Sequence, residues 1–387
     1  MKLAINNVNV VTLDKVIYGG SVTIENGIIT AVSNMPSVAE NVIDGNGGYL
    51  IPGFIDMHCH GGWGYDFTDC SKDEMSIIAN NHLGHGTTTM VATTLTARWN
   101  IIKNSLKTFK EYIEENPDGP LVGIHMEGPW FSPAQSGAQD PSYMREPKVE
   151  DIEELKSEYP FLMRVSVAPE IDKDMNFAKA CEKLGIVVSA GHTDADFECV
   201  EKAFDNGYKL LTHFYSGMKG VTRVNAYRVA GAVEAGYYID GMDVEIIADG
   251  RHLPYSLLKL IYKLKGADRV SLVTDATRGC GFLDGTETFI GTKEDPMPII
   301  IKNGVAFMSD GQSFAGSTST YDRLYRTMAE AIGKDVVALS KMTAYNPARI
   351  MKLNDRGEIA VGKRADLIVM NENLEIEKIL LKGCVIK

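Results

Sequence analysis

The chain has 387 residues, of which 44% are hydrophobic and 23% charged, as expected of a globular protein large enough to bury a full core. Its formal net charge of −12 argues against a nucleic-acid partner, because phosphate contacts need clustered lysine and arginine. The sequence shows no signal-peptide pattern, no apolar run of about 18 residues and no paired cysteines, so we expect a cytoplasmic protein without a membrane partner.

The two ends of the chain share one pattern. Residues 1 to about 48 contain short runs of alternating polarity separated by Gly-Gly and Asn-Gly turn signals, which is typical of antiparallel strands. The runs ADLIVMN and IEKILLKGCVIK near the other end are equally β-prone. We therefore predict one small β domain built from residues 1–53 and 352–387, beside a main domain of residues 54–351.

The main domain alternates apolar runs with amphipathic stretches, which is typical of βα units around a parallel core. Eight runs fit this pattern: residues 50–60, 87–95, 121–129, 163–170, 186–192, 209–216, 244–250 and 270–276. Stretches with the spacing of amphipathic helices lie between them, at residues 71–83, 99–115, 172–184, 194–206 and 255–264. Eight strands with intervening helices predict a closed (β/α)8 TIM barrel.

The segment after the eighth run reads differently. Residues 282–316 contain glycine turns between strand-like runs, so we predict a hairpin inserted at this point. Helices near residues 318–333 and 346–351 would then lead the chain back to the terminal β domain. This order leaves the barrel intact and places the insertion next to its last strand.

Ionisable residues stand where the predicted strands end. In a (β/α)8 barrel the catalytic groups lie at the C-terminal ends of the strands. Burying so many ionisable groups costs several kcal/mol unless they are paired or bind a metal. The groups concerned are His58 and His60 after the first run, His125 and Glu127 in the third, His192, His213, Asp249 and Asp275.

His58 and His60 are two residues apart, so on a strand both imidazoles point to one face and can reach one ion. Such a pair alone would equally fit polar turn histidines, and a single strand-end histidine would more often be a hydrogen-bonded core residue. Together with Glu127, His192 and His213 they indicate a metal site. Nitrogen and oxygen ligands without thiolate suit zinc or iron(II), with an open position for water.

Two further residues are candidates for the chemistry of that water. Asp275 would take a proton from the attacking water and deliver it to a leaving nitrogen. The alternative is a helix N-cap, for which Thr-Asp-Ala-Thr is also a good sequence. His252, just beyond the seventh run, would donate to a carbonyl oxygen as charge develops there, unless it is simply a solvated loop histidine.

With these residues in place, the chain resembles the amidohydrolase superfamily and, within it, the N-acetylglucosamine-6-phosphate deacetylases. The resemblance covers nearly the whole chain, because the matching motifs occur in the family's order and spacing. They are PGFIDMHCHGG, HMEGPWFSP, APE, GHTDA, THFYSGM, IADGRHLP, VTDAT, AGS, NPARI and GKRADLIV.

This resemblance implies a β-sandwich formed by both termini, and hydrolysis of an N-acetyl amino sugar 6-phosphate in a homodimer. It implies that Glu127, His192 and His213 hold a divalent ion, that His58 and His60 hold a second one in some members, and that Asp275 is the acid and base. Substrate contacts are implied for His252, Ala138, Gln139, Ser216, Gly217, Phe314, Ala315 and Gly316.

The sequence departs from the family pattern where the sugar phosphate would bind. Gly137-Ala138-Gln139 stands where the family commonly has Gly-Ala-His, and Ser216-Gly217 stands where it has Asn-Ala. The usual Arg-Glu-Pro-Gly is absent. Arg228, or alternatively Arg223, would supply the phosphate-binding guanidinium, whose planar fork donates in pairs.

Three other functions compete with this one. The first is deacetylation of a different amino sugar phosphate, of the galactosamine type. The second is hydrolysis of a cyclic amide, which is disfavoured because such enzymes typically bridge two metals with a carboxylated lysine, whereas Glu127 ends the third run here. The third is a non-catalytic scaffold, which would be expected to lose ligands or Asp275.

Overall fold

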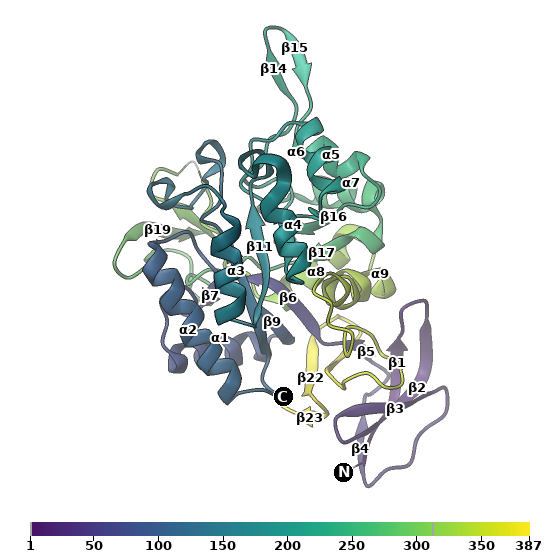
Figure 1. Ribbon diagram of the computed structural model, residues 1–387. Helices are drawn as coiled ribbons and strands as arrows, with labels where there is room; N and C mark the ends of the chain where they lie inside the picture. Colours follow the sequence, from purple (N-terminus) through teal and green to yellow (C-terminus); the bar gives the residue numbers. More distant parts are fainter. Residues whose placement is uncertain (1, 312) are drawn as a thin grey trace.

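A computed structural model describes residues 2–311 and 313–387 of the protein (Figure 1). Each of the eight predicted apolar runs forms a strand of one parallel sheet, and the strands neighbour one another in chain order. The predicted (β/α)8 barrel is therefore confirmed. Its strands are β6 (Phe54–Cys59), β9 (Thr87–Thr94), β10 (Leu121–Glu127), β11 (Leu162–Val167), β12 (Val187–Ala190), β13 (Leu210–Leu211), β16 (Asp243–Ile246) and β17 (Val270–Leu272).

Backbone hydrogen bonds just beyond the last strand bring it to the first one. The Asp275 amide donates to the His58 carbonyl over 2.9 Å, and the His60 amide donates to the Ala276 carbonyl over 2.8 Å. These bonds lie at the carboxyl ends of β6 and β17, so they place the polar ends of the first and eighth runs side by side.

Helices cover the outside of the sheet (Figure 1). They are α1 (Lys72–Gly84), α2 (Trp99–Glu115), α3 (Val149–Glu158), α4 (Asn176–Lys183), α5 (Phe197–Asp205), α6 (Ala232–Tyr238), α7 (Tyr255–Lys265), α8 (Tyr321–Ile332), α9 (Val336–Ser340) and α10 (Asn346–Ile350). The sequence pattern predicted all of these except α3, α6 and α9. No helix in the described ranges has both the length and the apolar character needed to cross a membrane.

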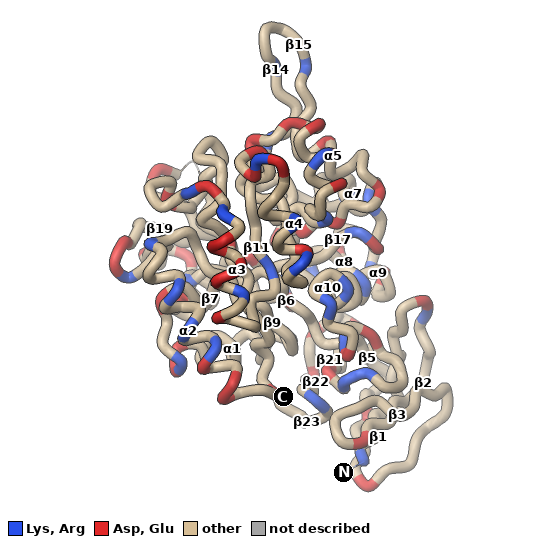
Figure 2. Tube along the Cα trace, in the orientation of Figure 1, with Lys and Arg blue, Asp and Glu red and all other residues tan. Residues whose placement is uncertain are grey.

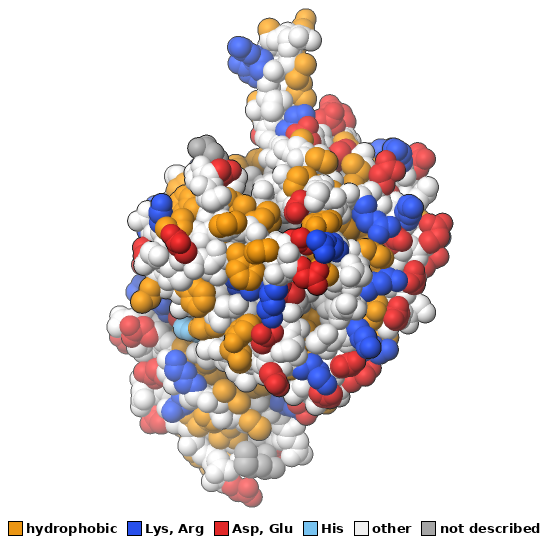
Figure 3. Space-filling view, turned by 90° about the vertical axis from the view of Figure 1, so that its left-hand side faces the viewer, with side chains coloured by type: hydrophobic (Ala, Val, Ile, Leu, Met, Phe, Trp, Pro, Cys, Tyr) orange, Lys and Arg blue, Asp and Glu red, His pale blue; other side chains and the backbone are white. Residues whose placement is uncertain are grey.

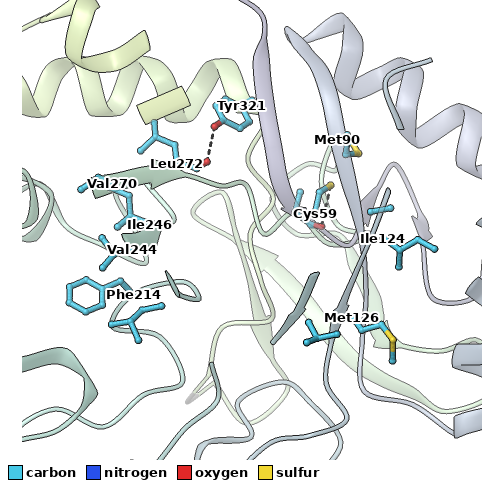
Figure 4. Close-up of a cluster of buried hydrophobic side chains, with 14 of the residues drawn as sticks. Cys59, Met90, Ile124, Met126, Phe214, Val244, Ile246, Val270, Leu272 and Tyr321 are labelled. Atoms are coloured by element: carbon cyan, nitrogen blue, oxygen red, sulfur yellow. Dashed lines mark hydrogen bonds between the residues drawn. The ribbon is translucent and has the colours of Figure 1, made fainter. Parts of the chain in front are cut away.

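The main hydrophobic core lies between the strands and this layer of helices. Figure 4 shows part of it, with Met90, Ile124 and Met126 in one group and Ile246 and Leu272 in another. All five of these side chains are fully buried. Strands of a parallel sheet read as continuous apolar runs because both of their faces are covered.

Both ends of the chain meet in a second sheet. Strand β5 pairs antiparallel with β21, so the N-terminal and C-terminal strands share one set of hydrogen bonds around a separate core that includes Ile5, Val22 and Leu367. The small terminal β domain is thus observed, whereas its division at residues 53 and 352 stays a prediction. Its strands are β1 (Lys2–Val11), β2 (Val16–Glu25), β3 (Ile28–Ser33), β4 (Asn41–Asp44), β5 (Tyr49–Pro52), β21 (Leu367–Met370), β22 (Ile376–Leu381) and β23 (Cys384–Val385).

The insertion at residues 282–316 has one strand more than predicted. It contains β18 (Glu287–Gly291), β19 (Pro296–Lys302) and β20 (Val305–Met308), which pair antiparallel in that order. The prediction of a simple hairpin was wrong. Two strands follow β18 instead of one, and the Asn-Gly turn at residues 303–304 joins β19 to β20.

The sequence pattern also missed a hairpin that projects from the barrel (Figure 1). Strands β14 (Thr222–Val224) and β15 (Tyr227–Val229) pair antiparallel, and Arg223 lies opposite Arg228. The turn residues Asn225 and Ala226 both have positive φ, which suits a tight two-residue turn. A shorter pair, β7 (Gly61–Gly62) and β8 (Tyr65–Asp66), follows the first barrel strand.

Tyr321 of α8 offers a test of how the helical layer is fixed to the barrel. Its ring stacks on Phe54 with centroids 4.9 Å apart, and its buried hydroxyl donates to the Leu272 carbonyl over 2.7 Å (Figure 4). We predict that Tyr321→Phe lowers the free energy of unfolding by about 1 kcal/mol, because it removes this hydrogen bond and keeps the ring. Denaturant unfolding measures the change.

The matched control is Tyr238→Phe, since the Tyr238 side chain is 69% exposed. This control should change the unfolding free energy by less than about 0.5 kcal/mol. Equal stability of the Tyr321→Phe chain and the parent would contradict the role given to the hydroxyl.

Candidate metal centre and active site

The polar ends of the barrel strands converge on the carboxylate of Glu127. His213 Nε2 lies 2.9 Å from Glu127 Oε1, and His192 Nε2 lies 3.4 Å from the same oxygen. On the other side, His58 Nε2 lies 3.4 Å from Oε1 and His60 Nε2 lies 3.2 Å from Oε2. Glu127 therefore lies between two pairs of imidazoles, and all five side chains are buried.

Asp275 faces the same cluster from the end of the eighth strand. Its Oδ1 lies 3.4 Å from His58 Nε2 and 3.2 Å from His60 Nε2. The backbone of Asp275, like that of His192 and His213, has a positive φ, which residues other than glycine seldom adopt. Such strain is characteristic of functional sites, where the surrounding structure holds the residue in place.

Hydrogen bonds at Nδ1 orient the ligand histidines. His192 Nδ1 lies 2.8 Å from the Gln135 carbonyl, and His213 Nδ1 lies 3.0 Å from the Ser216 carbonyl. Because a carbonyl only accepts, Nδ1 must carry the proton in both rings. In the neutral ring Nε2 then has a free lone pair directed at Glu127, which is the usual support for a metal-binding histidine.

The donor atoms fit a divalent ion. Two groups have ligand atoms within 4.8 Å of one another: His58, His60 and Glu127 in one, and Glu127, His192 and His213 in the other. Each group combines imidazole nitrogens with a carboxylate and contains no thiolate, which suits a borderline divalent ion. Glu127 belongs to both groups.

Charge within the cluster shifts the pKa values of its members. Burial alone would raise the pKa of Glu127, but the imidazoles of His58 and His192 hold that pKa well below its usual range. Burial alone would lower the pKa of His58 and of His60, yet Glu127 and Asp275 raise these values to about 9 and about 10. The pKa of Asp275 is lowered, because the charges of His58 and His60 outweigh burial.

A cavity of about 220 Å³ opens over the cluster. Most of the residues predicted to contact substrate line it. They are Ala138, Gln139, Ser216, Gly217, His252, Phe314 and Gly316. Ala315 is fully buried beside the cavity wall, and Arg228 is exposed on the hairpin, so neither lines the cavity within this chain. Leu95, Thr277, Ile290 and Ser313 also line it, and the sequence pattern did not single them out.

Gln139 contacts the Glu127 carboxylate directly. Its amide nitrogen donates to Glu127 Oε2 over 2.5 Å, and its amide oxygen accepts from the Thr96 backbone amide over 2.7 Å. On the opposite wall, His252 Nδ1 lies 2.8 Å from Asp249 Oδ2, and its ring packs on Phe314 with centroids 4.7 Å apart. Asp249 therefore holds the His252 ring in place.

His125 does not join the cluster. Its Nε2 lies 2.7 Å from Ser166 Oγ and its Nδ1 lies 3.2 Å from Thr93 Oγ1, so both ring nitrogens have partners inside the barrel. Its ring packs edge-on against His58, with centroids 4.8 Å apart. His125 therefore supports a candidate ligand by packing, without a hydrogen bond to it.

A buried ion pair lies below the cluster, and the sequence analysis missed it. Arg164 of β11 and Glu245 of β16 are both fully buried and hydrogen-bonded to each other. Burial alone would raise the pKa of Glu245, but Arg164 and His58 lower it to about 2. A signal was available, because each is a charged residue inside an otherwise apolar strand run.

Comparison with known proteins identifies the family of the chain. The amidohydrolase family profile matches residues 49–387. The chain belongs to the amidohydrolase family. This metal-dependent amide hydrolase is 31% identical over 390 residues to an N-acetylglucosamine-6-phosphate deacetylase of Bacillus subtilis, with 98% of the chain and 96% of that relative covered.

Two further proteins bear on this amidohydrolase. The crystal structure of N-acetylglucosamine-6-phosphate deacetylase from Thermotoga maritima matches it with a TM-score of 0.88 at 32% identity and covers 99% of both chains. An N-acetylgalactosamine-6-phosphate deacetylase of Escherichia coli O157:H7 is 29% identical over 364 residues, covering 93% of each protein. The likeness thus extends to enzymes of both sugar epimers.

We predict that zinc binding to the metal-free protein releases protons. Because the pKa values of His58 and His60 are raised to about 9 and about 10, both imidazoles hold protons at neutral pH and zinc must displace them. Zinc affinity should therefore rise with pH, by up to about tenfold per pH unit for each proton displaced. Calorimetric titration in buffers of different ionisation enthalpy measures the protons released.

The His60→Gln variant is the control, because it lacks one of the two titrating imidazoles. It should release about one proton fewer on binding zinc. A zinc affinity that does not change between about pH 6 and about pH 8 would show that protons do not compete at these ligands.

Proposed function

We propose that this chain hydrolyses N-acetylglucosamine 6-phosphate to glucosamine 6-phosphate and acetate, as a step in amino sugar catabolism. The observation that carries the proposal is that Asp275, 3.2 Å from His60, lines the same cavity of about 220 Å³ as the Glu127 cluster. This is the arrangement that hydrolysis of an amide needs, and the curated relatives of nearly full length deacetylate amino sugar phosphates.

In the proposed mechanism Glu127, His192 and His213 would hold one divalent ion, and His58 and His60 would hold a second one where it is present. Zinc or iron(II) suits these ligands. A bound ion of this kind polarises the amide carbonyl and lowers the pKa of the attacking water. The remaining steps belong to side chains of the protein.

Asp275 acts first as base and then as acid. Its lowered pKa keeps it ionised near neutrality, so it accepts the proton of the attacking water. It then gives this proton to the amine nitrogen as the bond to the acetyl carbon breaks. His252, held by Asp249 over 2.8 Å, would donate to the carbonyl oxygen as negative charge develops there.

The cavity walls would orient the sugar. Ala138 and Gln139 line one part, Ser216 and Gly217 another, and Phe314 and Gly316 form the wall beside His252. Gln139 also donates to Glu127, so it would link the sugar-binding wall to the metal ligand.

None of the described residues that line the cavity is a lysine or arginine that could bind a phosphate. Two exposed arginines, Arg223 and Arg228, lie opposite each other on the hairpin β14–β15, which projects from the barrel (Figures 1 and 2). In the space-filling view the hairpin also carries hydrophobic side chains (Figure 3). We propose a cytoplasmic homodimer in which Arg228 binds the phosphate, with Arg223 as the alternative.

N-acetylgalactosamine 6-phosphate is the second candidate substrate, because one full-length relative acts on it. The two sugars differ only at C4, and the departures at Gln139 and Ser216 lie on the cavity wall. Acetate release from both phosphosugars and from unphosphorylated N-acetylglucosamine would choose between them. Release from none of the three by metal-loaded protein would refute the deacetylase proposal.

Asp275→Asn should lower the rate of acetate release by about a hundredfold or more, because an amide cannot take the proton of the water. Metal content should stay close to that of the parent, since the cluster of Glu127 and the four histidines is intact. Acetate release and metal content are measured on the same preparation. Unchanged turnover would remove Asp275 from the mechanism.

Arg228→Ala should raise KM for the phosphorylated substrate at least about tenfold and leave KM for the unphosphorylated sugar unchanged, because a charge-assisted bidentate contact is lost. The matched control is Arg223→Ala, on the facing strand of the same hairpin. If instead Arg223→Ala raises KM for the phosphorylated sugar alone and Arg228→Ala does not, Arg223 binds the phosphate. If KM rises equally for both sugars, neither arginine does.

A further inference from the structure

The ion pair below the metal centre contacts a ligand histidine. Glu245 Oε2 lies 3.3 Å from His58 Nδ1, on the side of the ring away from the cluster. Arg164 donates to both carboxylate oxygens of Glu245, to Oε1 through Nη1 and to Oε2 through Nη2 over 3.0 Å. Glu245 is therefore clamped between a guanidinium and an imidazole, and all three side chains are fully buried.

Arg164 is itself fixed by several other acceptors. Its Nη1 donates to the Met57 carbonyl over 3.2 Å, and its Nη2 donates to the hydroxyls of Ser189 and Thr212 over 3.1 Å each. These partners come from β6, β12 and the end of β13. The guanidinium thus joins strands around the barrel and holds the Glu245 carboxylate in one orientation.

His58 differs from the other candidate ligands in what supports it. His192 and His213 use backbone carbonyls at Nδ1, and His60 Nδ1 has no hydrogen-bond partner among the described residues. Only His58 among these four has a carboxylate at this position. A carboxylate paired with a guanidinium is an acceptor only, so Nδ1 of His58 has to be the donor.

We propose that Glu245, clamped by Arg164, is a positioning residue that holds the Nδ1 proton of His58, so that Nε2 is the ring nitrogen offered to a metal, and so sets the affinity of the ion shared by His58 and His60. A negative partner also makes the imidazole a stronger ligand. The inference rests on the proposed metal-dependent function. It predicts that the affinity of one of the two ions depends on Glu245 much more strongly than that of the other.

The test is Glu245→Gln, which keeps the shape and changes the direction of one hydrogen bond. An amide NH₂ can donate to His58 Nδ1, and the ring proton then moves to Nε2, where it faces Glu127 and blocks the ion. Zinc affinity at the site of His58 and His60 should fall by about 10- to 100-fold. Affinity at the site of Glu127, His192 and His213 should fall much less, because Glu245 touches that site only at the His213 backbone amide, over 3.3 Å, and the Nδ1 partners of His192 and His213 are unchanged.

Zinc bound per chain is measured at buffered free zinc concentrations. In zinc-loaded protein with ¹⁵N-histidine, the hydrogen-bonded Nδ1–H signal of His58 should be present in the parent and absent in Glu245→Gln. Ser189→Ala is the matched control, because it removes a partner of Arg164 without touching His58 or Glu245. This control should retain both zinc ions and the Nδ1–H signal.

A neutral amide leaves Arg164 buried without a counter-charge, which endangers folding. The double variant Arg164→Met/Glu245→Gln removes both charges. If the single variant does not fold, the zinc affinities and the His58 Nδ1–H signal are measured on this double variant, with the same expected results. Retention of both zinc ions at parental affinity overturns the proposal. So does a parent chain that binds only one ion at saturating zinc, or a folded variant that loses both.

These measurements involve no substrate. If the chain did not deacetylate these sugars, the zinc affinities and the His58 signal would still test the positioning role of Glu245. Conversely, an active enzyme whose second zinc ion is indifferent to Glu245 would refute only the positioning role.

Discussion

The arrangement of the site depends on one buried carboxylate, that of Glu127, which lies between two pairs of imidazoles. Burying so many ionisable groups together costs free energy unless they are paired or bind a metal, and a divalent ion would compensate part of that cost. The barrel brings these residues together, because the C-terminal ends of β6 and β10 and the loops after β12, β13 and β17 all lie at the same end of the parallel sheet. Positive φ at His192, His213 and Asp275 shows that the backbone is held away from its preferred conformation there.

Much of this could be predicted from the sequence, because strand ends in a barrel have a fixed meaning. The alternation of eight apolar runs with amphipathic stretches was enough to predict the strands, and the residues that end these runs include His58, Glu127, His213 and Asp275. The terminal strands could likewise be predicted from their alternating polarity, because one face of their sheet packs on a core of its own. In both cases local pattern and tertiary burial agree.

What escaped prediction depends on contacts between distant residues. Arg164 and Glu245 come from separate strands, and nothing in either run states that the two charges meet inside the barrel. The hairpin β14–β15 is exposed on both faces, so it has little of the alternation that marks a half-buried strand. The contact from Gln139 to Glu127 depends on a loop conformation that the residue types alone do not determine.

The pairing of β5 with β21 has a consequence for synthesis of the chain. The strands β1 to β5 leave the ribosome first, yet β5 obtains its antiparallel partner only when residues near the other terminus have been translated. For most of translation β5 therefore presents an unpaired edge, a template for association with another nascent chain. Protection of that edge until Leu367–Met370 arrives would decide how much polypeptide reaches the native state in a crowded cell.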